Sequence, residues 1–483
     1  MVEMLFKNMA EEIVNETFAN LLTIERQQEI EHIGKRWDFY DGNQEKWIKQ
    51  YIGEEDDEWK EKEKIKLNYT RLVVDKYIEG IFGKPVKVEF EDRSYQDIWD
   101  AIISPRTFYD ISPFMKMVQR IAEISDTCAI IVRTNPKTGD ITFEDIRGEF
   151  LHFVPKENDG KQIGRIEISY PFDSFVAGDR LRHRVEIWDE ESYGVYIFSD
   201  RTKKLLYADE GVNPYGFIPI VLFQPKKDDN TFYGLTNIGD VTDINQSYNN
   251  LWTSLATIVE MQSFSVLVVK TAKEFKAEFG PKRFIKFDQL PNDERSPDDA
   301  YYITPNAKIS DVKNVLMMMK SELQNISSMP SSVIQTGDSG SPESGYALKI
   351  RQMPLESQYF DKKTTYGPSY LRLAKMSVII SLINQGKNYI PGFNDIIANV
   401  KFAEETVSLS PNEQIMKDDA DLRNNIITPI DIMIRENPEM TREEAQTKWL
   451  ENRKFNESIG MEQFENTEDM IGEDEENDSE NTE

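Results

Sequence analysis

Two long stretches with apolar residues at helical spacing, 236–262 and 306–330, constrain the fold of this 483-residue chain more than any other feature. The first keeps an apolar stripe from Ile238 to Val259 for about seven turns, roughly 40 Å at 1.5 Å per residue. The second has the same spacing, so each stretch is predicted to be one long helix with an apolar side.

The insert between these helices, 263–305, has its own pattern. SFSVLVVK predicts a strand, AKEFKAEF a short helix that stops at Gly280-Pro281, RFIKF a second strand and YYIT a third. Its charges are divided along the chain. The first half carries Lys270, Lys273, Lys276, Lys282, Arg283 and Lys286, and the second half carries Asp288, Asp293, Glu294, Asp298 and Asp299. This division fits head-to-tail pairing of subunits or steering of an acidic partner, and it equally fits an ordinary solvated surface.

The segment 331–345, SSVIQTGDSGSPESG, follows the second helix and contains no lysine or arginine. Small polar residues bury too little apolar surface to offset the entropy of ordering them, so we expect a mobile loop. Such a loop between two helices is either a surface linker or a working part.

The remaining regions differ in their periodicity. The first 80 residues are predicted to be mainly helical, with a turn at FYDGN, 39–43. From about 127 to 224, β-branched and aromatic runs separated by turn signals predict a β-rich region, closed by NPYGFIPIVLFQPKK, whose prolines restrict it to an edge or a loop. We expect a helix after residue 345 that Pro354 and Gly367-Pro368 kink or divide.

The C-terminal section is predicted to contain three short helices within 411–460. They begin at Ser410-Pro411, Thr428-Pro429 and the capping box Thr441-Arg442-Glu443-Glu444. The last residues, 461–483, hold eleven acids and no lysine or arginine, which predicts disorder.

Several classes of function are disfavoured by the composition. A net charge of −29 argues against a sequence-specific DNA-binding protein. No GxxxxGK[ST] loop is present, the three histidines lack zinc-site spacing, and Cys128 in TCAIIV fits a buried small residue. Acidic runs fit solvated faces better than a two-metal site. We therefore expect no enzymatic activity, cofactor or metal, and no membrane-spanning helix, secretion signal or membrane partner.

Several stretches and their order along the chain resemble the portal proteins, or head-to-tail connectors, of tailed double-stranded DNA phages. These stretches are FYDGN, NYTRLVVDKYIEGIFGKPVKVEF at 68–90, YGLTNIGDVTDINQSYNNLWTSLATIVE at 233–260 and SGYALKIRQMPLESQYFDKK at 344–363. The likeness covers most of residues 30–455, and it is to the branch found in siphoviruses of Gram-positive hosts.

This resemblance implies an α+β portal fold with named parts. These are a wing over 1–235 that is β-rich from about 127, a stem of paired helices at 236–262 and 306–330, an α/β clip at 263–305, a tunnel loop at 331–345, a long broken helix and wing return at 346–410, a helical crown at 411–460 and an acidic tail at 461–483.

The family further implies a ring of twelve copies at one capsid vertex of the virion, assembled in the host cytoplasm. Double-stranded DNA passes through its channel without sequence specificity. The partners implied are the terminase large subunit, the major capsid and scaffold proteins, and a head-completion or adaptor protein.

In this interpretation the tunnel loop forms a collar around DNA. The residues that meet the duplex are Gln335, Thr336, Gly337, Asp338, Ser339, Gly340, Ser341 and Glu343. They offer hydrogen bonds and repulsion but no cation, which suits a conduit because each Lys or Arg contact to phosphate strengthens binding steeply. A capsid-associated scaffold or adaptor, and a metal-dependent DNA-processing enzyme, are the alternative functions.

Overall fold

A computed structural model describes most of the chain. The described residues are 24–50, 63–104, 111–135, 137–173, 181–263, 266–270, 299–303, 309–334, 345–387, 389–403, 411–424, 426–437 and 440–458. They fall into two compact units. The first comprises residues 1–339 and 350–405, and the second comprises 340–349 and 406–483.

The first unit begins with helices. They are α3 (Ile24–Asp41), the short η1 (Gln44–Trp47), α5 (Tyr69–Ile81), α6 (Arg93–Ile103) and α7 (Ile111–Ser125). The predicted turn after α3 is confirmed, with Gly42 at φ +87°. Helix α5 ends at Ile81, and the chain turns so closely at Gly83 that a Cβ there would lie 2.0 Å from the Glu79 carbonyl oxygen. Residues 1–23 of the predicted N-terminal helix lie outside the described residues.

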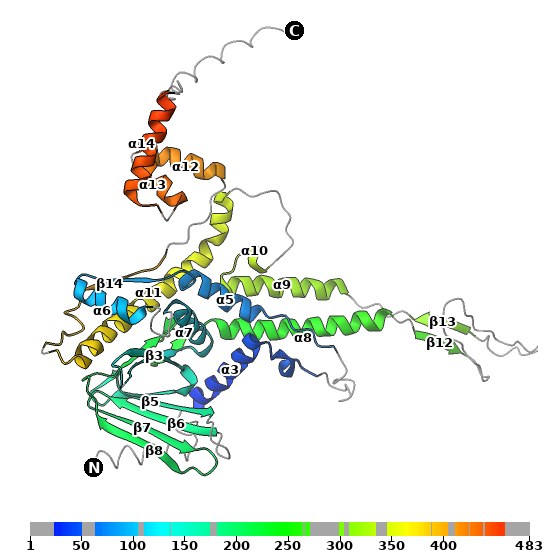
Figure 1. The fold of residues 1–483 in the computed structure, drawn as a ribbon. Helices are drawn as coiled ribbons and strands as arrows, with labels where there is room; N and C mark the ends of the chain where they lie inside the picture. Colours follow the sequence, from blue (N-terminus) through cyan, green and yellow to red (C-terminus); the bar gives the residue numbers. More distant parts are fainter. Residues whose placement is uncertain are drawn as a thin grey trace, which may run out of the picture. The chain divides into compact units, whose positions relative to one another are not determined.

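Two antiparallel sheets follow and confirm the β-rich prediction. One has the order β3-β2-β9, with β2 at Cys128–Thr134, β3 at Ile141–Arg147 and β9 at Ile220–Phe223. The other is a five-stranded meander of β4 (Leu151–Lys156), β5 (Asp159–Asp173), β6 (Leu181–Asp189), β7 (Ser192–Ser199) and β8 (Leu205–Val212) (Figure 1). As its flanking prolines predict, β9 is an edge strand.

Strand β2 is an unbroken apolar run because both of its faces are buried. Ile130 and Val132 pack into the main core with helix residues such as Val118 of α7. Ala129 and Ile131 pack on the other side, in a second core with residues of the meander such as Ile166. Cys128 is fully buried in the main core, as predicted for a small apolar residue.

The long helices α8 (Ile238–Ser263) and α9 (Ile309–Ser327) lie side by side (Figure 1). Tyr248 and Leu255 of α8 pack against Leu316 of α9. Between the two helices in sequence, β12 (Val266–Lys270) pairs antiparallel with β13 (Asp299–Ile303), which confirms two of the predicted strands. The predicted helix and middle strand of this insert lie outside the described residues.

Two predictions about the chain after α9 are wrong in part. Residues Ser331–Ile334, expected to start a loop, form the short helix α10, because Val333 and the buried Ile334 pack onto the main core. The following helix α11, Gly345–Asn384, is one helix of 40 residues and is not divided at Pro354 or at Gly367-Pro368. Buried residues on both sides of the prolines, such as Tyr359 and Tyr370, hold it against the core.

Two short antiparallel pairs complete the first unit. β1 (Lys87–Phe90) pairs with β14 (Ala398–Lys401), and β10 (Lys226–Lys227) pairs with β11 (Gly234–Leu235).

The second unit contains α12 (Pro411–Arg423), α13 (Pro429–Glu436) and α14 (Arg442–Ser458), which confirms the three predicted helices. Thr428 and Asp431 form the expected reciprocal capping box at α13. Thr441 and Glu444 form another at α14, with 3.0 Å from the Thr441 backbone nitrogen to Glu444 Oε2. Ser410 and the acidic tail lie outside the described residues.

Candidate functional site

Most residues predicted to carry the function lie outside the described residues. These are Gln335, Thr336, Gly337, Asp338, Ser339, Gly340, Ser341 and Glu343 of the loop, and Lys273, Lys276, Lys282, Arg283, Lys286, Asp288, Asp293, Glu294 and Asp298 of the insert. Of the insert residues, only Lys270 and Asp299 are placed, and the strand register sets them opposite each other. The structure does describe how the helices before and after the loop segment are attached to the core.

The last carbonyl groups of α9, the helix before the loop, accept hydrogen bonds from other parts of the chain. Ser328 has a left-handed φ of 54°, which turns the chain out of the helix. The Tyr77 hydroxyl donates to the Ser327 carbonyl at 2.8 Å, and the Asn237 amide donates to the Ile326 carbonyl at 3.1 Å and to the Tyr77 hydroxyl at 2.8 Å. Terminal carbonyls that have no partner within the helix are therefore bonded by α5 and by the residue before α8.

The helix after the loop, α11, is held by a buried ion pair. Lys362 Nζ lies 2.6 Å from Glu123 Oε2 of α7, and both side chains are at least nine-tenths buried. The ammonium also lies 4.2 Å from the centre of the Tyr77 ring, close enough for a cation–π contact. Removing one member would leave an uncompensated charge in the core. Tyr77 thus contacts the attachments of both helices that flank the loop.

A glycine in α5 allows α11 to approach closely. Tyr359 of α11 donates from its hydroxyl to the Lys76 carbonyl at 3.0 Å. A Cβ at Gly80 would lie only 2.2 to 2.4 Å from atoms of the Tyr359 ring. No other residue fits at position 80 unless α11 moves away from α5.

Helix α8 is attached by a row of polar side chains at helical spacing. Asn245 Oδ1 accepts from the backbone nitrogens of Tyr69 at 2.9 Å and Thr70 at 3.1 Å, and its amide donates to the Leu67 carbonyl at 2.7 Å. Asn249 accepts from the Leu67 nitrogen at 3.0 Å, and Thr253 from the Ile65 nitrogen at 3.2 Å. We call this row the amide seam. It binds the segment 63–68 and the start of α5 through their backbone, so the sequence of that segment matters little to the contact.

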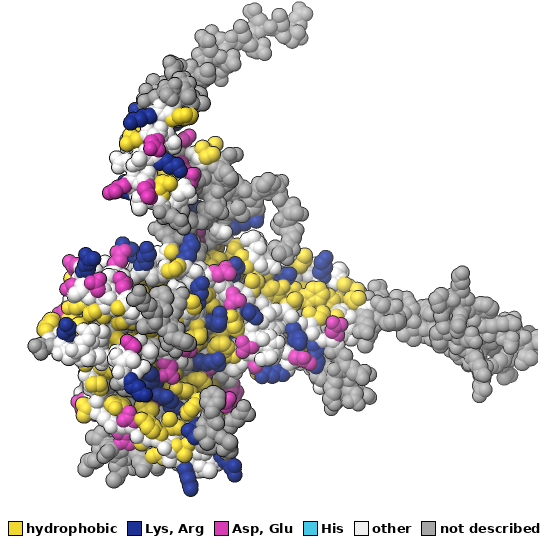
Figure 2. Space-filling view, in the orientation of Figure 1, with side chains coloured by type: hydrophobic (Ala, Val, Ile, Leu, Met, Phe, Trp, Pro, Cys, Tyr) yellow, Lys and Arg dark blue, Asp and Glu magenta, His cyan; other side chains and the backbone are white. Residues whose placement is uncertain are grey.

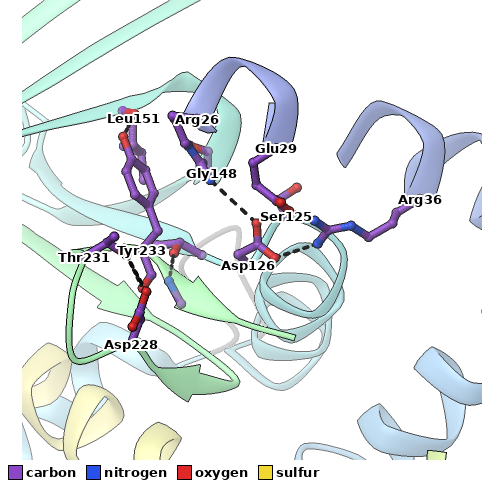
Figure 3. Close-up of polar contacts among 12 residues, drawn as sticks. Arg26, Glu29, Arg36, Ser125, Asp126, Gly148, Leu151, Asp228, Thr231 and Tyr233 are labelled. Atoms are coloured by element: carbon purple, nitrogen blue, oxygen red, sulfur yellow. Dashed lines mark hydrogen bonds and ion pairs between the residues drawn. The ribbon is translucent and has the colours of Figure 1, made fainter. Parts of the chain in front are cut away.

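A cavity of about 660 Å³ lies beside α3 and the first turns of α8. Its lining is rich in charge of both signs and includes Arg26, Glu29, Lys35, Arg36, Asp126 and Asp243. Figure 3 shows Asp126 between Arg26 and Arg36. Arg36 Nη1 donates to Asp126 Oδ1 at 2.6 Å and to the Ile124 carbonyl at 2.9 Å, and Arg36 also pairs with Glu29.

The charges around this cavity serve the fold. Asp126 has a left-handed φ of 65°, and its two arginine partners hold the turn between α7 and β2. Burial raises the pKa of the Asp126 carboxyl, while Arg36 opposes that shift. Arg26 stacks 3.6 Å from the centre of the Tyr233 ring, whose hydroxyl donates to the Leu151 carbonyl. The cavity wall is a structural ion-pair cluster joining α3 to the sheets.

Residues suited to catalysis or metal binding do not gather in the described part of the chain. No group of three or more His, Cys, Asp or Glu side chains in it could hold a metal ion. Burial raises the pKa of the Cys128 thiol well above its usual value, which disfavours the reactive thiolate. His152 bonds to Glu167 at 2.8 Å, and His183 bonds to the Ser169 hydroxyl at 2.6 Å, both between neighbouring strands. No described helix is long and apolar enough to cross a membrane.

The structure brings together residues that sequence reasoning missed. The amide seam has a signal that could have been found: Thr242, Asn245, Asn249 and Thr253 recur every three or four positions within DVTDINQSYNNLWTS. Glu123 and Lys362 had no such signal, because nothing in either local sequence names a partner 239 positions away.

Comparison with known proteins gives one family match. Residues 21–454 match the family model described as "Phage portal protein, SPP1 Gp6-like". A search of curated proteins finds no match.

Solved structures similar to this chain include a virion of a native gene transfer agent particle, at 11% identity and a TM-score of 0.42, covering 73% of this chain and 84% of that one. The neck of an empty particle of the same agent gives 12% identity and a TM-score of 0.44, covering 74% and 85%. The neck of the native particle computed with C12 symmetry gives 11% and 0.43, covering 74% and 86%.

Proposed function

Because the chain belongs to the SPP1 Gp6-like family of phage portal proteins, we propose that twelve copies form a ring whose channel admits and releases the phage genome. Portal proteins are structural, non-enzymatic components of the virion neck, at a capsid vertex. This identity sets aside a metal-dependent DNA-processing enzyme and a scaffold outside the channel.

The finer assignments belong to the same proposal. The helix pair α8 and α9 is the stem, 263–305 the clip, 335–344 the tunnel loop, 411–460 the crown, and the β-rich region with its flanking helices the wing. The collinear stretches at 68–90 and 233–260 support placing the protein in the branch from siphoviruses of Gram-positive hosts.

The observation that carries the loop assignment is the attachment of the helices on both sides of 335–344. Tyr77 and Asn237 bond the end of α9, and Glu123 pairs with Lys362 of α11. A segment whose flanking helices are fixed in the core can change its own conformation without unfolding its surroundings. With no cation in the segment, it can touch the duplex without gripping it.

The loop assignment can be tested by introducing large side chains into the loop. Ser339→Trp with Ser341→Trp should block DNA packaging while leaving ring assembly intact. The matched control places tryptophan at Lys137 and Lys204, two exposed positions on turns of the β-rich region. A normal yield of packaged DNA from the loop variant would contradict the collar.

The clip is proposed to dock first the terminase large subunit and later a head-completion or adaptor protein. Its basic first half would steer an acidic partner surface. Lys282→Glu with Arg283→Glu should weaken binding of the terminase large subunit more than it weakens ring formation. Unchanged affinity at low salt would refute this part of the proposal. The major capsid and scaffold proteins are further proposed partners.

A further inference from the structure

Strand β8 is an edge of the five-stranded meander, because β7 alone pairs with it among the described residues (Figure 1). An edge strand directs the amide and carbonyl groups of alternate residues away from its sheet, where another strand can bond them. The register with β7 shifts once, near Leu206, and the six residues from Tyr207 to Val212 then pair without interruption. We call Tyr207–Val212 the open edge.

The opposite edge of the meander, β4, is blocked. Pro155 removes one backbone donor from β4, and the register with β5 shifts twice around that proline. The Tyr233 hydroxyl donates to the Leu151 carbonyl at 2.8 Å, and the Tyr233 ring lies 4.9 Å from the Phe153 ring. Residues 207–212, in contrast, contain no proline, lysine or arginine. One edge of this sheet is therefore protected against a further strand, and the other is available to one.

The open edge exposes apolar side chains on both faces of the sheet. Tyr207 is 51% exposed and Val212 is 81% exposed. Because they lie five positions apart in regular register, they point to opposite faces. Figure 2 shows hydrophobic side chains exposed among charged ones over the meander, in the lower part of the view. An added strand would continue both faces and contact both side chains, whereas a partner surface packed on one face would reach one of them.

Charge along β8 is divided between its two ends. The turn before it, 200–204, contains three basic residues and one acid. The open edge contains Asp209 and Glu210, which as successive residues of a strand point to opposite faces. Glu210 Oε2 is buried and, within the described part of the chain, accepts no hydrogen bond. A carboxylate oxygen in this position favours a cationic partner.

A second copy of β8 fits this edge poorly. Antiparallel self-pairing over the open edge would set Asp209 opposite Glu210, and like charges directly opposite each other are destabilising. A register that sets Lys204 opposite Asp209 would instead centre beside Leu206, where the strand is irregular. The two acids thus disfavour self-association and favour a basic segment of another protein.

We propose that the open edge binds an extended segment of a partner protein, which adds an antiparallel sixth strand to the meander. Antiparallel pairing matches the other pairs of this sheet and is slightly more stable per residue than parallel pairing. In that direction the segment carries basic residues first, opposite Glu210 and Asp209, then β-branched or aromatic residues opposite Tyr207, and then an acid opposite Lys204. Backbone hydrogen bonds supply affinity, and the order of charges supplies specificity. This interaction is additional to the proposed ring and does not depend on it.

The first experiment measures binding of a synthetic peptide to the purified full chain. The probe is the fluorescein-labelled peptide VTKRVITVE, in which lysine and arginine would lie opposite Glu210 and Asp209, and glutamate opposite Lys204. Fluorescence anisotropy at low salt should show saturable binding. The charge-reversed peptide VTEEVITVK should bind about tenfold more weakly or worse. A probe that does not bind, or equal binding of the two peptides, would overturn the proposal.

Methylation of peptide amides distinguishes strand addition from charge attraction alone. Methyl groups on the alternate amides that face β8 should abolish binding, whereas methyl groups on the other alternate set should change the affinity by less than about threefold. Amide hydrogen exchange at Tyr207–Val212 should also slow when the probe is bound. If both methylated peptides bind equally, strand addition is wrong.

A pair of protein variants tests the location of the site. Asp209→Lys with Glu210→Lys should weaken binding of the probe about tenfold or more and should reverse the preference between the two peptides. The matched control, Asp140→Lys with Glu157→Lys, makes the same charge change at two exposed positions on other turns of the β-rich region and should bind the probe like the parent. Circular dichroism checks that both variants are folded. Parent-like binding by the first variant would place the peptide elsewhere and refute the open edge.

Native mass spectrometry of the unmodified chain tests the competing occupant. Dimers that Asp209→Lys with Glu210→Lys alters and the control leaves unchanged would assign the open edge to a second copy and overturn the proposal. The same spectra report ring formation separately. A chain that binds the probe without forming rings would contradict the proposed function alone, and rings that do not bind the probe would contradict this inference alone.

Discussion

The two longest helices of the portal subunit, α8 and α11, are attached to their surroundings by different forces. Helix α11 is held by buried aromatic rings and by the Glu123–Lys362 ion pair. Helix α8 is held by the amide seam, whose neutral hydrogen bonds bind backbone groups of the segment 63–68 and of the first two residues of α5. Removing the partner of a buried charge is strongly destabilising, whereas a single neutral hydrogen bond contributes only modestly to folding stability. The position of α11 is therefore fixed more strictly than the contact between α8 and that segment.

The largest expected effect comes from removing one member of the buried Glu123–Lys362 ion pair. Lys362→Met should lower the free energy of unfolding by about 3–5 kcal/mol, because Glu123 is left charged in the core. Denaturant unfolding of the full chain measures it. The variant with both Glu123→Met and Lys362→Met should recover most of the loss. A single variant within about 1 kcal/mol of the parent would contradict the account.

The next effect tests how closely α11 packs on α5. Gly80→Ala forces a Cβ into the Tyr359 ring and should cost about 1–3 kcal/mol of unfolding free energy. Gly34→Ala in α3 is the matched control, because no atom lies within 4 Å of its added Cβ, and it should stabilise by up to about 1 kcal/mol. Equal effects of the two substitutions would show that the close approach does not matter.

The amide seam should respond more locally. Asn245→Ala removes the acceptor of the Tyr69 and Thr70 nitrogens and should cost about 1–2 kcal/mol. The measurement is amide hydrogen exchange at Tyr69 and Thr70, which should quicken while exchange in α11 stays slow. Asn250→Ala, whose side chain accepts from the more exposed Lys49 nitrogen, should have a smaller effect. Faster exchange throughout the unit would refute the local role.

The smallest expected effect lies in the second unit. Thr428→Ala removes the N-cap of α13 and should cost about 1 kcal/mol of local stability. Amide exchange at Asp431, whose nitrogen donates to the Thr428 hydroxyl, should quicken, while Tyr69 and Leu67 keep the parent rate. An unchanged rate at Asp431 would mean that the capping box does not stabilise α13.

The sequence predicted the features that depend on neighbouring residues. The stripe of α8, the turn at Gly42 and the capping boxes at Thr428 and Thr441 each act within one helix or turn, so their signal is local. The predicted division of α11 at its prolines was wrong because it considered only local effects. Pro354 and Pro368 act locally against the helix, but buried side chains such as Tyr366 outweigh that cost through contacts distant in sequence.

The site was predictable only in outline. Composition indicated a polar segment without cations at 331–345, but not that its first residues, including Val333 and Ile334, form a short helix. The Tyr77 hydroxyl bonds a carbonyl 250 residues away, and Lys362 reaches Glu123 across 239. Such pairs depend on the folded topology, which the spacing of residues in one segment does not encode.

The central claim is that many copies enclose a hole bordered by the segment 335–344. Electron microscopy of the purified full chain, extended to a symmetric reconstruction, tests it most directly. The account predicts closed rings in which this segment borders the axial opening. Single particles without a hole, or rings with the segment on their outer rim, would contradict it.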